Sequence, residues 1–247
     1  MVRTFFINGR AHRKWTPATF VSYYLVLLVF FRWCIKQGYI TTNFADDIEI
    51  PRPDKKLPPK LTKQDALRLL EVVYNYPYEF KFLRYRNHAI FATFLFAGLR
   101  KSELINLKFV DVDIKNLSIF ISQGKGKKDR IIPISYTLAQ TLKRYIDERS
   151  RLKKTCPEFF ASSTQNNGYS DGGLRHLIIQ MRKASGVNFS AHKLRHTFAT
   201  LMLEGGCDIY SLSKMMGHSD IKTTTIYLAA SAEHLRSQMT KHPLNDL

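Results

Sequence analysis

Cysteine is scarce in this sequence, and its spacing excludes two kinds of site. The 247 residues contain three cysteines, Cys34, Cys156 and Cys207. They are odd in number, far apart and without CxxC spacing, which argues against a disulfide framework and against a zinc site. This usage is typical of a reducing compartment, so we expect a cytoplasmic protein.

Long apolar runs are also few. The most apolar stretch, residues 20–31, contains Ser22 and stops at Arg32. It is shorter than the roughly 20 residues that a membrane span needs. It begins too late for a signal peptide and lacks a small-residue cleavage site. We therefore expect no membrane partner, and we find no internal repeat.

Acidic residues are outnumbered by basic ones. Lys and Arg total 38 against 20 Asp and Glu, a net charge of +18. So large a surplus favours a polyanionic partner, with nucleic acid as the first candidate. A merely solvated basic surface is the alternative. Apolar residues make up 45% of the chain, enough to form a packed core.

Helix signals and one proline-rich stretch indicate two parts. Thr16-Pro17 is a helix start, and the pattern predicts a helix over residues 17–37 that ends at Gly38. Residues 43–59 hold four prolines among charged residues, which is typical of a linker. Thr62 opens a second block, with helices expected through residue 73, over 82–97 and over 102–107.

The hydrophobic period then changes and later changes back. Residues 108–114, 117–122 and 130–134 have strand patterns and predict a small antiparallel three-stranded sheet. Helical patterns return from Tyr136 to about residue 230, followed by a polar tail. The predicted fold class is mainly α with this sheet inserted (α+β). The predicted domains are 1–50, a linker over 51–60, and 61–247 including the tail.

Two basic segments suit phosphate binding. Arg100 follows Gly98 at the junction of two helices, where backbone N–H groups and a guanidinium converge. Lys125 lies between glycines in a predicted hairpin, which allows close approach to a nucleic-acid backbone. Each alone has a plainer interpretation, as a helix turn and as a solvated basic loop.

Two further segments contain histidines. On a helix His192 and Arg195 share a face, and His192 and His196 have the spacing of a zinc pair. The zinc interpretation fails because Lys193 stands where that motif needs Glu. His218 is followed nine residues later by Tyr227; a lone His or Tyr is usually structural.

Together these segments resemble the tyrosine recombinase (phage integrase) family. The matching stretches are GLRKSEL, GKGKKDRIIPI, HKLRHTFAT and MGHSDIKTTTIY, in that order. The resemblance covers about residues 60–242 and is nearest to Xer-type and transposon-type integrases. It implies a catalytic domain preceded by a helical, SAM-like core-binding domain. Only about 58 residues precede the catalytic block here, so we expect that domain to be partial.

The resemblance implies a site-specific recombinase whose nucleophile is Tyr227. Tyr227 would attack a backbone phosphorus and form a 3′-phosphotyrosyl bond. Arg100 and Arg195 would bind the non-bridging oxygens, because their planar donors match phosphate geometry.

The remaining catalytic positions are His218, Lys125 and His192. His218 would donate a hydrogen bond to the same phosphate, and Lys125 would protonate the departing 5′ oxygen. His192 would assist removal of the phenol proton, since a tyrosine with a pKa of about 10 is mostly protonated at neutral pH. The resemblance implies no metal, no other cofactor and no ATP.

Partners follow from the same resemblance. We expect double-stranded DNA, bound by a homo- or hetero-tetramer on two DNA sites, with phosphate contacts from Lys127, Lys128 and Arg130. Glu103 is expected to orient Arg100, and His196 to be a buried supporting residue. Two alternatives stay open: a type IB topoisomerase, and a DNA-binding remnant or regulator without catalysis.

The short N-terminal part leaves one more question open. The helix from Pro17 is unusually apolar and would expose a large apolar face. A truncated chain, a covering second subunit, or residues 1–14 wrapped back over that face are the three explanations.

Overall fold

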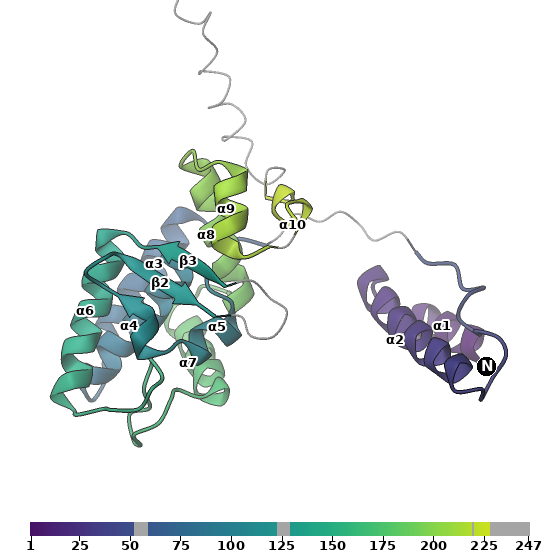
Figure 1. Ribbon diagram of the computed structural model, residues 1–247, viewed down its shortest axis with the longest axis horizontal. Helices are drawn as coiled ribbons and strands as arrows, with labels where there is room; N and C mark the ends of the chain where they lie inside the picture. The colour runs from purple at the N-terminus through teal and green to yellow at the C-terminus, as the bar shows by residue number, and fades with distance from the viewer. Residues whose placement is uncertain (52–58, 123–128, 219, 228–247) are drawn as a thin grey trace, which may run out of the picture. The chain divides into compact units, whose positions relative to one another are not determined.

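A computed structural model of the chain describes residues 1–51, 59–122, 129–218 and 220–227 (Figure 1). The chain divides into two compact units, Met1–Lys56 and Leu57–Leu247, and each is described by itself. The predicted hairpin loop with Lys125 and the polar tail lie outside the described residues.

The first unit contains two helices, α1 (Val2–Ala11) and α2 (Pro17–Lys36). The hydroxyl of Thr16 accepts the backbone N–H of Thr19, so α2 begins where the sequence predicts. Helix α1 occupies a stretch in which the sequence showed only weak patterning. It packs on α2 through Phe6 and Phe20, whose ring centroids are 4.6 Å apart. Residues 1–14 thus cover part of α2.

Much of α2 remains exposed. Its exposed apolar side chains are Tyr23, Leu25, Val26, Val29, Phe30, Trp33 and Ile35. At 20 residues, α2 is long and apolar enough to cross a membrane by length and composition alone. The apolar run over residues 20–31 is itself shorter than a membrane span, as expected, but the helix that contains it is longer. Its apolar character extends to both sides of residues 20–31.

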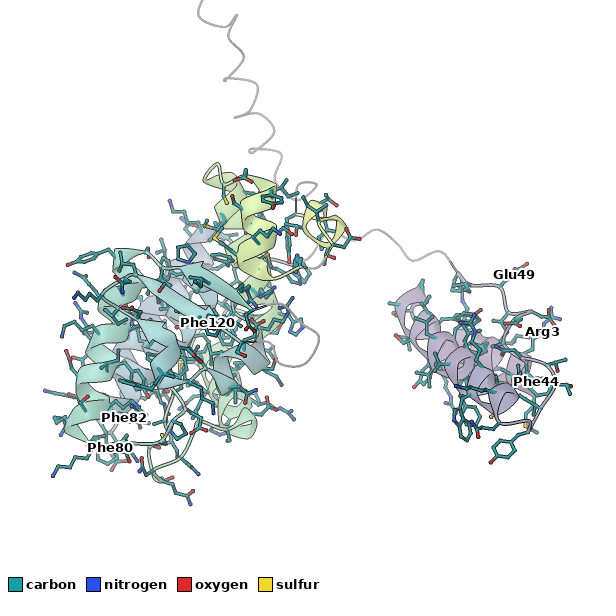
Figure 2. All side chains as sticks on the ribbon, in the orientation of Figure 1. Arg3, Phe44, Glu49, Phe80, Phe82 and Phe120 are labelled. Carbon is teal, nitrogen blue, oxygen red and sulfur yellow. The ribbon has the colours of Figure 1, made fainter. Side chains whose placement is uncertain are left out.

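The core of the second unit forms around α4. The elements up to the sheet are α3 (Lys63–Asn75), α4 (Lys81–Ala97), α5 (Lys101–Asn106) and a short 3-10 helix (Phe109–Asp111). Helix α4 packs against α3, α6 (Tyr136–Arg151) and α8 (Ala191–Glu204), so it is buried on several sides. Figure 2 labels two residues at its start: Phe82 is 1% exposed, whereas Phe80 is 56% exposed.

The sheet has three antiparallel strands in the order β1 (Val112–Asp113), β2 (Ser118–Ile121) and β3 (Arg130–Pro133). Ile119 pairs with Ile132, and both side chains are buried. Phe120, labelled in Figure 2, faces the other side and is 38% exposed. This alternation confirms the predicted sheet. Strand β1 is shorter than expected because residues 109–111 form the 3-10 helix.

Four helices follow α6 among the described residues: α7 (Asp171–Ser185), α8, α9 (Ile209–Met216) and α10 (Lys222–Thr225). Serine or aspartate side chains cap α7, α8 and α9 at Ser170, Ser190 and Asp208. Helices α8, α9 and α10 gather in the green to yellow part of Figure 1, and β3 contacts α9. The expected fold class is confirmed.

Candidate active site

The junction of α4 and α5 positions Arg100. Gly98 ends α4 with φ +62, in the left-handed region that favours glycine. A Cβ at Gly98 would also lie 2.2 Å from the ring of Phe198 on α8. Glycine therefore permits both the turn and the close approach of α8, and Arg100 follows as the residue preceding α5.

Glu103 occupies the centre of a cluster of arginines. Its carboxylate accepts the backbone N–H of Arg100 at 2.7 Å and Nη1 of the same residue at 2.7 Å. Arg130 donates to both carboxylate oxygens, at 3.0 and 2.8 Å. Nη1 of Arg195 lies 3.8 Å from Oε2 of Glu103. Burial would raise the pKa of Glu103, but the hydrogen bonds from Arg130 and Arg100 outweigh it and lower the pKa to about 2.

Arg130 differs from its expected role at the DNA surface. Its side chain is only 8% exposed, and beyond its bonds to Glu103 its Nε donates to the backbone carbonyl of Met215 at 2.8 Å. The guanidinium thus binds two internal acceptors from α5 and α9. Local sequence could not show this, because Glu103 lies 27 residues away along the chain.

Arg195 lies deep in the site, 8% exposed. It donates to the carbonyls of Gly98 and Met216. Arg100 similarly donates from Nη2 to the carbonyl of Gly217 at 2.9 Å. Both arginines therefore bind the backbone at the end of α9. Burial and the nearby Arg100 lower the pKa of Arg195 to about 10, so it remains a cation at neutral pH.

His218 follows the end of α9 and bridges two groups. Its Nε2 lies 3.4 Å from Nη2 of Arg195, and its Nδ1 lies 2.7 Å from the hydroxyl of Thr224. Arginine has only donors, so Nε2 accepts and a neutral ring donates from Nδ1 to Thr224. Burial, with Arg195 and Arg100 nearby, lowers the pKa of His218 to about 4. The ring is therefore neutral at pH 7 without DNA.

Tyr227 lies at the end of α10 and is 2% exposed. It packs in a small core with Phe198, Leu212 and Met216, and its hydroxyl lies 2.7 Å from Nδ1 of His196. Burial raises its pKa, and the nearby Arg195 and Arg100 oppose that rise. Tyr227 is thus held inside the site as a neutral phenol.

One cavity of about 470 Å³ brings together five of the six predicted catalytic residues: Arg100, His192, Arg195, His218 and Tyr227. His192 is exposed, whereas Arg195 is buried. The sixth, Lys125, and the predicted DNA contacts Lys127 and Lys128 lie outside the described residues. A second cavity of about 480 Å³ is lined by residues from Arg100 to Ser122.

Two partners in this site were not assigned by sequence reasoning. The first is Thr224, whose hydroxyl is hydrogen-bonded to Nδ1 of His218. His196 was expected to be a supporting residue, and it contacts the hydroxyl of Tyr227. Within the described part of the chain, no group of three or more His, Cys, Asp and Glu side chains is placed to hold a metal ion.

Comparison with known proteins places this chain in a family. The model of the phage integrase family matches residues 59–234. Tyrosine recombinase XerA of Pyrococcus horikoshii is 35% identical over 202 residues, covering 81% of this chain and 67% of the relative. Tyrosine recombinase XerC of Thermodesulfovibrio yellowstonii is 33% identical over 250 residues, covering 97% and 81%.

Solved structures agree. The crystal structure of XerA recombinase superposes with a TM-score of 0.65 at 27% identity, covering 98% of this chain and 82% of the other. XerH bound to its palindromic difH substrate after cleavage gives a TM-score of 0.76 at 22% identity, covering 98% and 71%, and shows the shared fold. The chain therefore belongs to the phage integrase family. Its enzymatic class is that of the tyrosine-type site-specific DNA recombinases.

Proposed function

We propose that this chain cleaves and rejoins double-stranded DNA through a covalent bond between Tyr227 and a 3′ phosphate. The observation that carries the proposal is the shared cavity: the buried Tyr227 lines the same cavity as Arg100, Arg195 and His218. Of the two compact units, we propose that the second is the catalytic domain and that the first belongs to a core-binding domain.

The charges of the site suit a phosphodiester. Arg100, Arg130 and Arg195 surround one carboxylate, that of Glu103, which leaves two positive charges uncompensated. A phosphodiester carries one negative charge, and the five-coordinate transition state formed by a phenolate carries two. The site therefore stabilises the transition state more than the bound substrate, which is the condition for catalysis.

The reaction is a transesterification. The Tyr227 oxygen bonds to phosphorus, the bond to the 5′ oxygen breaks, and a proton from Lys125 reaches that oxygen. Reversal by the 5′ hydroxyl of another strand rejoins the DNA. Because the phosphotyrosine keeps an ester bond, we propose that neither ATP nor a metal ion takes part.

DNA also rearranges the hydrogen bonds of the site. A phosphate oxygen would take the Arg195 donor that now meets Nε2 of His218. Nε2 could then bind a proton, and His218 would donate to the phosphate. His192 lines the same cavity, and the family resemblance assigns it a part in removing the phenol proton.

The partners proposed are double-stranded DNA and three further recombinase subunits, the same or different, on two DNA sites. Relatives in solved structures support the DNA partner: one is described as a complex with difH and another as a λ integrase dimer on a core site. Lys127 and Lys128 are proposed to contact DNA phosphates.

A covalent-trapping assay tests the proposal. The protein is incubated with nicked duplexes of random sequence, and a denaturing gel separates a protein–DNA adduct. We expect an adduct from the unchanged protein and none from Tyr227→Phe, which keeps the buried ring. DNA binding without any adduct would indicate a non-catalytic binder. Relaxation of a supercoiled plasmid that lacks the DNA sequence found in the adduct would indicate a topoisomerase.

A further inference from the structure

The inference concerns His196, a residue outside the set that sequence resemblance assigns to catalysis. Its Nδ1 lies 2.7 Å from the hydroxyl of Tyr227, and the two rings are 5.5 Å apart between centroids. The contact joins residues 31 positions apart, so it depends on the packing of the described residues after α9 against α8. Both side chains line the cavity with Arg100 and Arg195.

The chemistry of the nucleophile needs a proton acceptor at this point. Burial raises the pKa of Tyr227 above its ordinary value of 10.0. Fewer than about one phenol in a thousand is then ionised at pH 7. A neutral imidazole within hydrogen-bond distance of the hydroxyl makes prior ionisation unnecessary, because it accepts the proton as the oxygen attacks.

The surroundings keep His196 neutral. Burial lowers its pKa, and the neighbouring His192 and Arg195 on the same helix lower it further. His218, which lines the same cavity, is itself neutral at pH 7 without DNA. A bound phosphodiester would offset part of the charge of Arg195 and Arg100. The imidazolium formed by proton transfer would therefore be better tolerated with DNA in place.

We propose that Nδ1 of His196 accepts the phenolic proton of Tyr227 during attack, which makes His196 a further catalytic residue. The inference rests on the proposed function. The O–H bond of Tyr227 breaks as its oxygen bonds to phosphorus, and the proton goes to Nδ1. The bond between phosphorus and the 5′ oxygen breaks, and that oxygen takes up the proton that the proposed function assigns to Lys125. Rejoining runs the same steps in reverse, with His196 returning the proton to the phenol.

His196→Asn is the informative variant. An amide of that length still reaches the phenol but cannot bind a proton near neutral pH. His192→Asn is the competing variant, one helical turn earlier in the same cavity. The proposed function also gives His192 a part in removing the phenol proton, so the two variants together show which imidazole accepts it. Thermal melting and DNA affinity of each variant report on folding and binding. His196→Gln provides a second polar replacement if His196→Asn does not fold.

The rate of adduct formation is measured from pH 5 to 10 on the sequence trapped by the unchanged protein. A second substrate has sulfur in place of the bridging 5′ oxygen, and this leaving group needs no proton. We expect His196→Asn to slow attack about 10²- to 10⁴-fold at pH 7 on both substrates. Its rate should rise about tenfold per pH unit toward the pKa of Tyr227, whereas the unchanged protein reaches a plateau at lower pH.

Three results would overturn the inference. The first is a folded His196→Asn protein with the rate and pH profile of the unchanged protein. The second is a faster His196→Asn protein, which would make the hydrogen bond a restraint on the nucleophile. The third is the expected profile appearing in His192→Asn instead. These leave the proposed function intact. If the unchanged protein forms no adduct on any substrate, the proposed function itself fails, and the inference with it.

Discussion

Replacing Glu103 by Gln tests the electrostatic design of the site. The change keeps the shape of the side chain and removes the one carboxylate among Arg100, Arg130 and Arg195. Three guanidinium groups then face one another without compensation, and the amide nitrogen offers a donor where Arg130 needs an acceptor. The structure therefore predicts a large loss of stability from a nearly isosteric substitution.

Two estimates of the magnitude agree. The pKa of Glu103 falls from 4.5 to about 2 on folding, which corresponds to about 3 kcal/mol. Breaking a buried ion pair by removing one partner costs about 3–5 kcal/mol. For a unit of this size, each kcal/mol lowers the melting temperature by about 2–4 °C, so the expected drop is about 6–12 °C.

The pH dependence has a defined sign. The folded pKa is depressed, so the stabilisation is complete above about pH 4.5 and is lost as the pH falls toward 2. We would measure the free energy of unfolding by urea titration, for the unchanged protein and for Glu103→Gln, from pH 7 downward. Their difference should be about 3 kcal/mol at pH 7 and should shrink through this window.

Asp147→Asn is the matched control. It makes the same carboxyl-to-amide change in an exposed i,i+4 ion pair with Lys143 on α6. That pair should contribute no more than about 0.5 kcal/mol. The reasoning is refuted if Glu103→Gln costs as little as Asp147→Asn, or if its cost does not change between pH 7 and pH 2.

Three further predictions use the same measurements. Gly98→Ala should lower the free energy of unfolding more than Gly186→Ala. Both positions have positive φ, which costs alanine about 1–2 kcal/mol, but of the two only Gly98 has a ring, that of Phe198, 2.2 Å from the new Cβ. Equal losses would contradict the close approach of Phe198. Arg130→Met should lower the free energy of unfolding by about 3–5 kcal/mol and leave the salt dependence of DNA affinity unchanged. If the slope of log affinity against log salt concentration falls by about one instead, Arg130 contacts a DNA phosphate. Thr224→Val should lower the free energy of unfolding by about 1–3 kcal/mol, because Nδ1 of His218 loses its hydrogen-bond acceptor. Thr224→Ser keeps a hydroxyl and should retain most of that stability. Equal stability of the two variants would argue against this hydrogen bond.

Local signals in the sequence predicted much of the fold. The caps at Thr16 and Thr62, the alternation at Ile119 and Ile121, and the glycine after α4 depend on neighbouring residues, so they are readable without a structure. The sequence did not predict helix α1, because polar and basic residues and Gly9 interrupt its apolar residues. It depends on Phe6 packing against α2.

The sequence predicted only those site residues that lie in recognisable motifs. Order and spacing singled out Arg100, Arg195, His218 and Tyr227, and the structure places them in one cavity. The sequence could not show that the Arg130 side chain binds the carboxylate of Glu103. A basic residue beside a basic loop has the same local pattern whether it contacts DNA or a buried carboxylate. The pairing of His196 with Tyr227 joins residues that only the packing of α8 brings together.

The central claim is that the Tyr227 oxygen becomes bonded to DNA. The most direct measurement is mass spectrometry of the trapped adduct after digestion with a nuclease and a protease. We predict that the peptide containing Tyr227 carries the added nucleotide mass, with fragmentation placing it on that side chain as a 3′ phosphodiester. A nucleotide attached to any other residue, or to Tyr227 through a 5′ phosphate, would contradict the account.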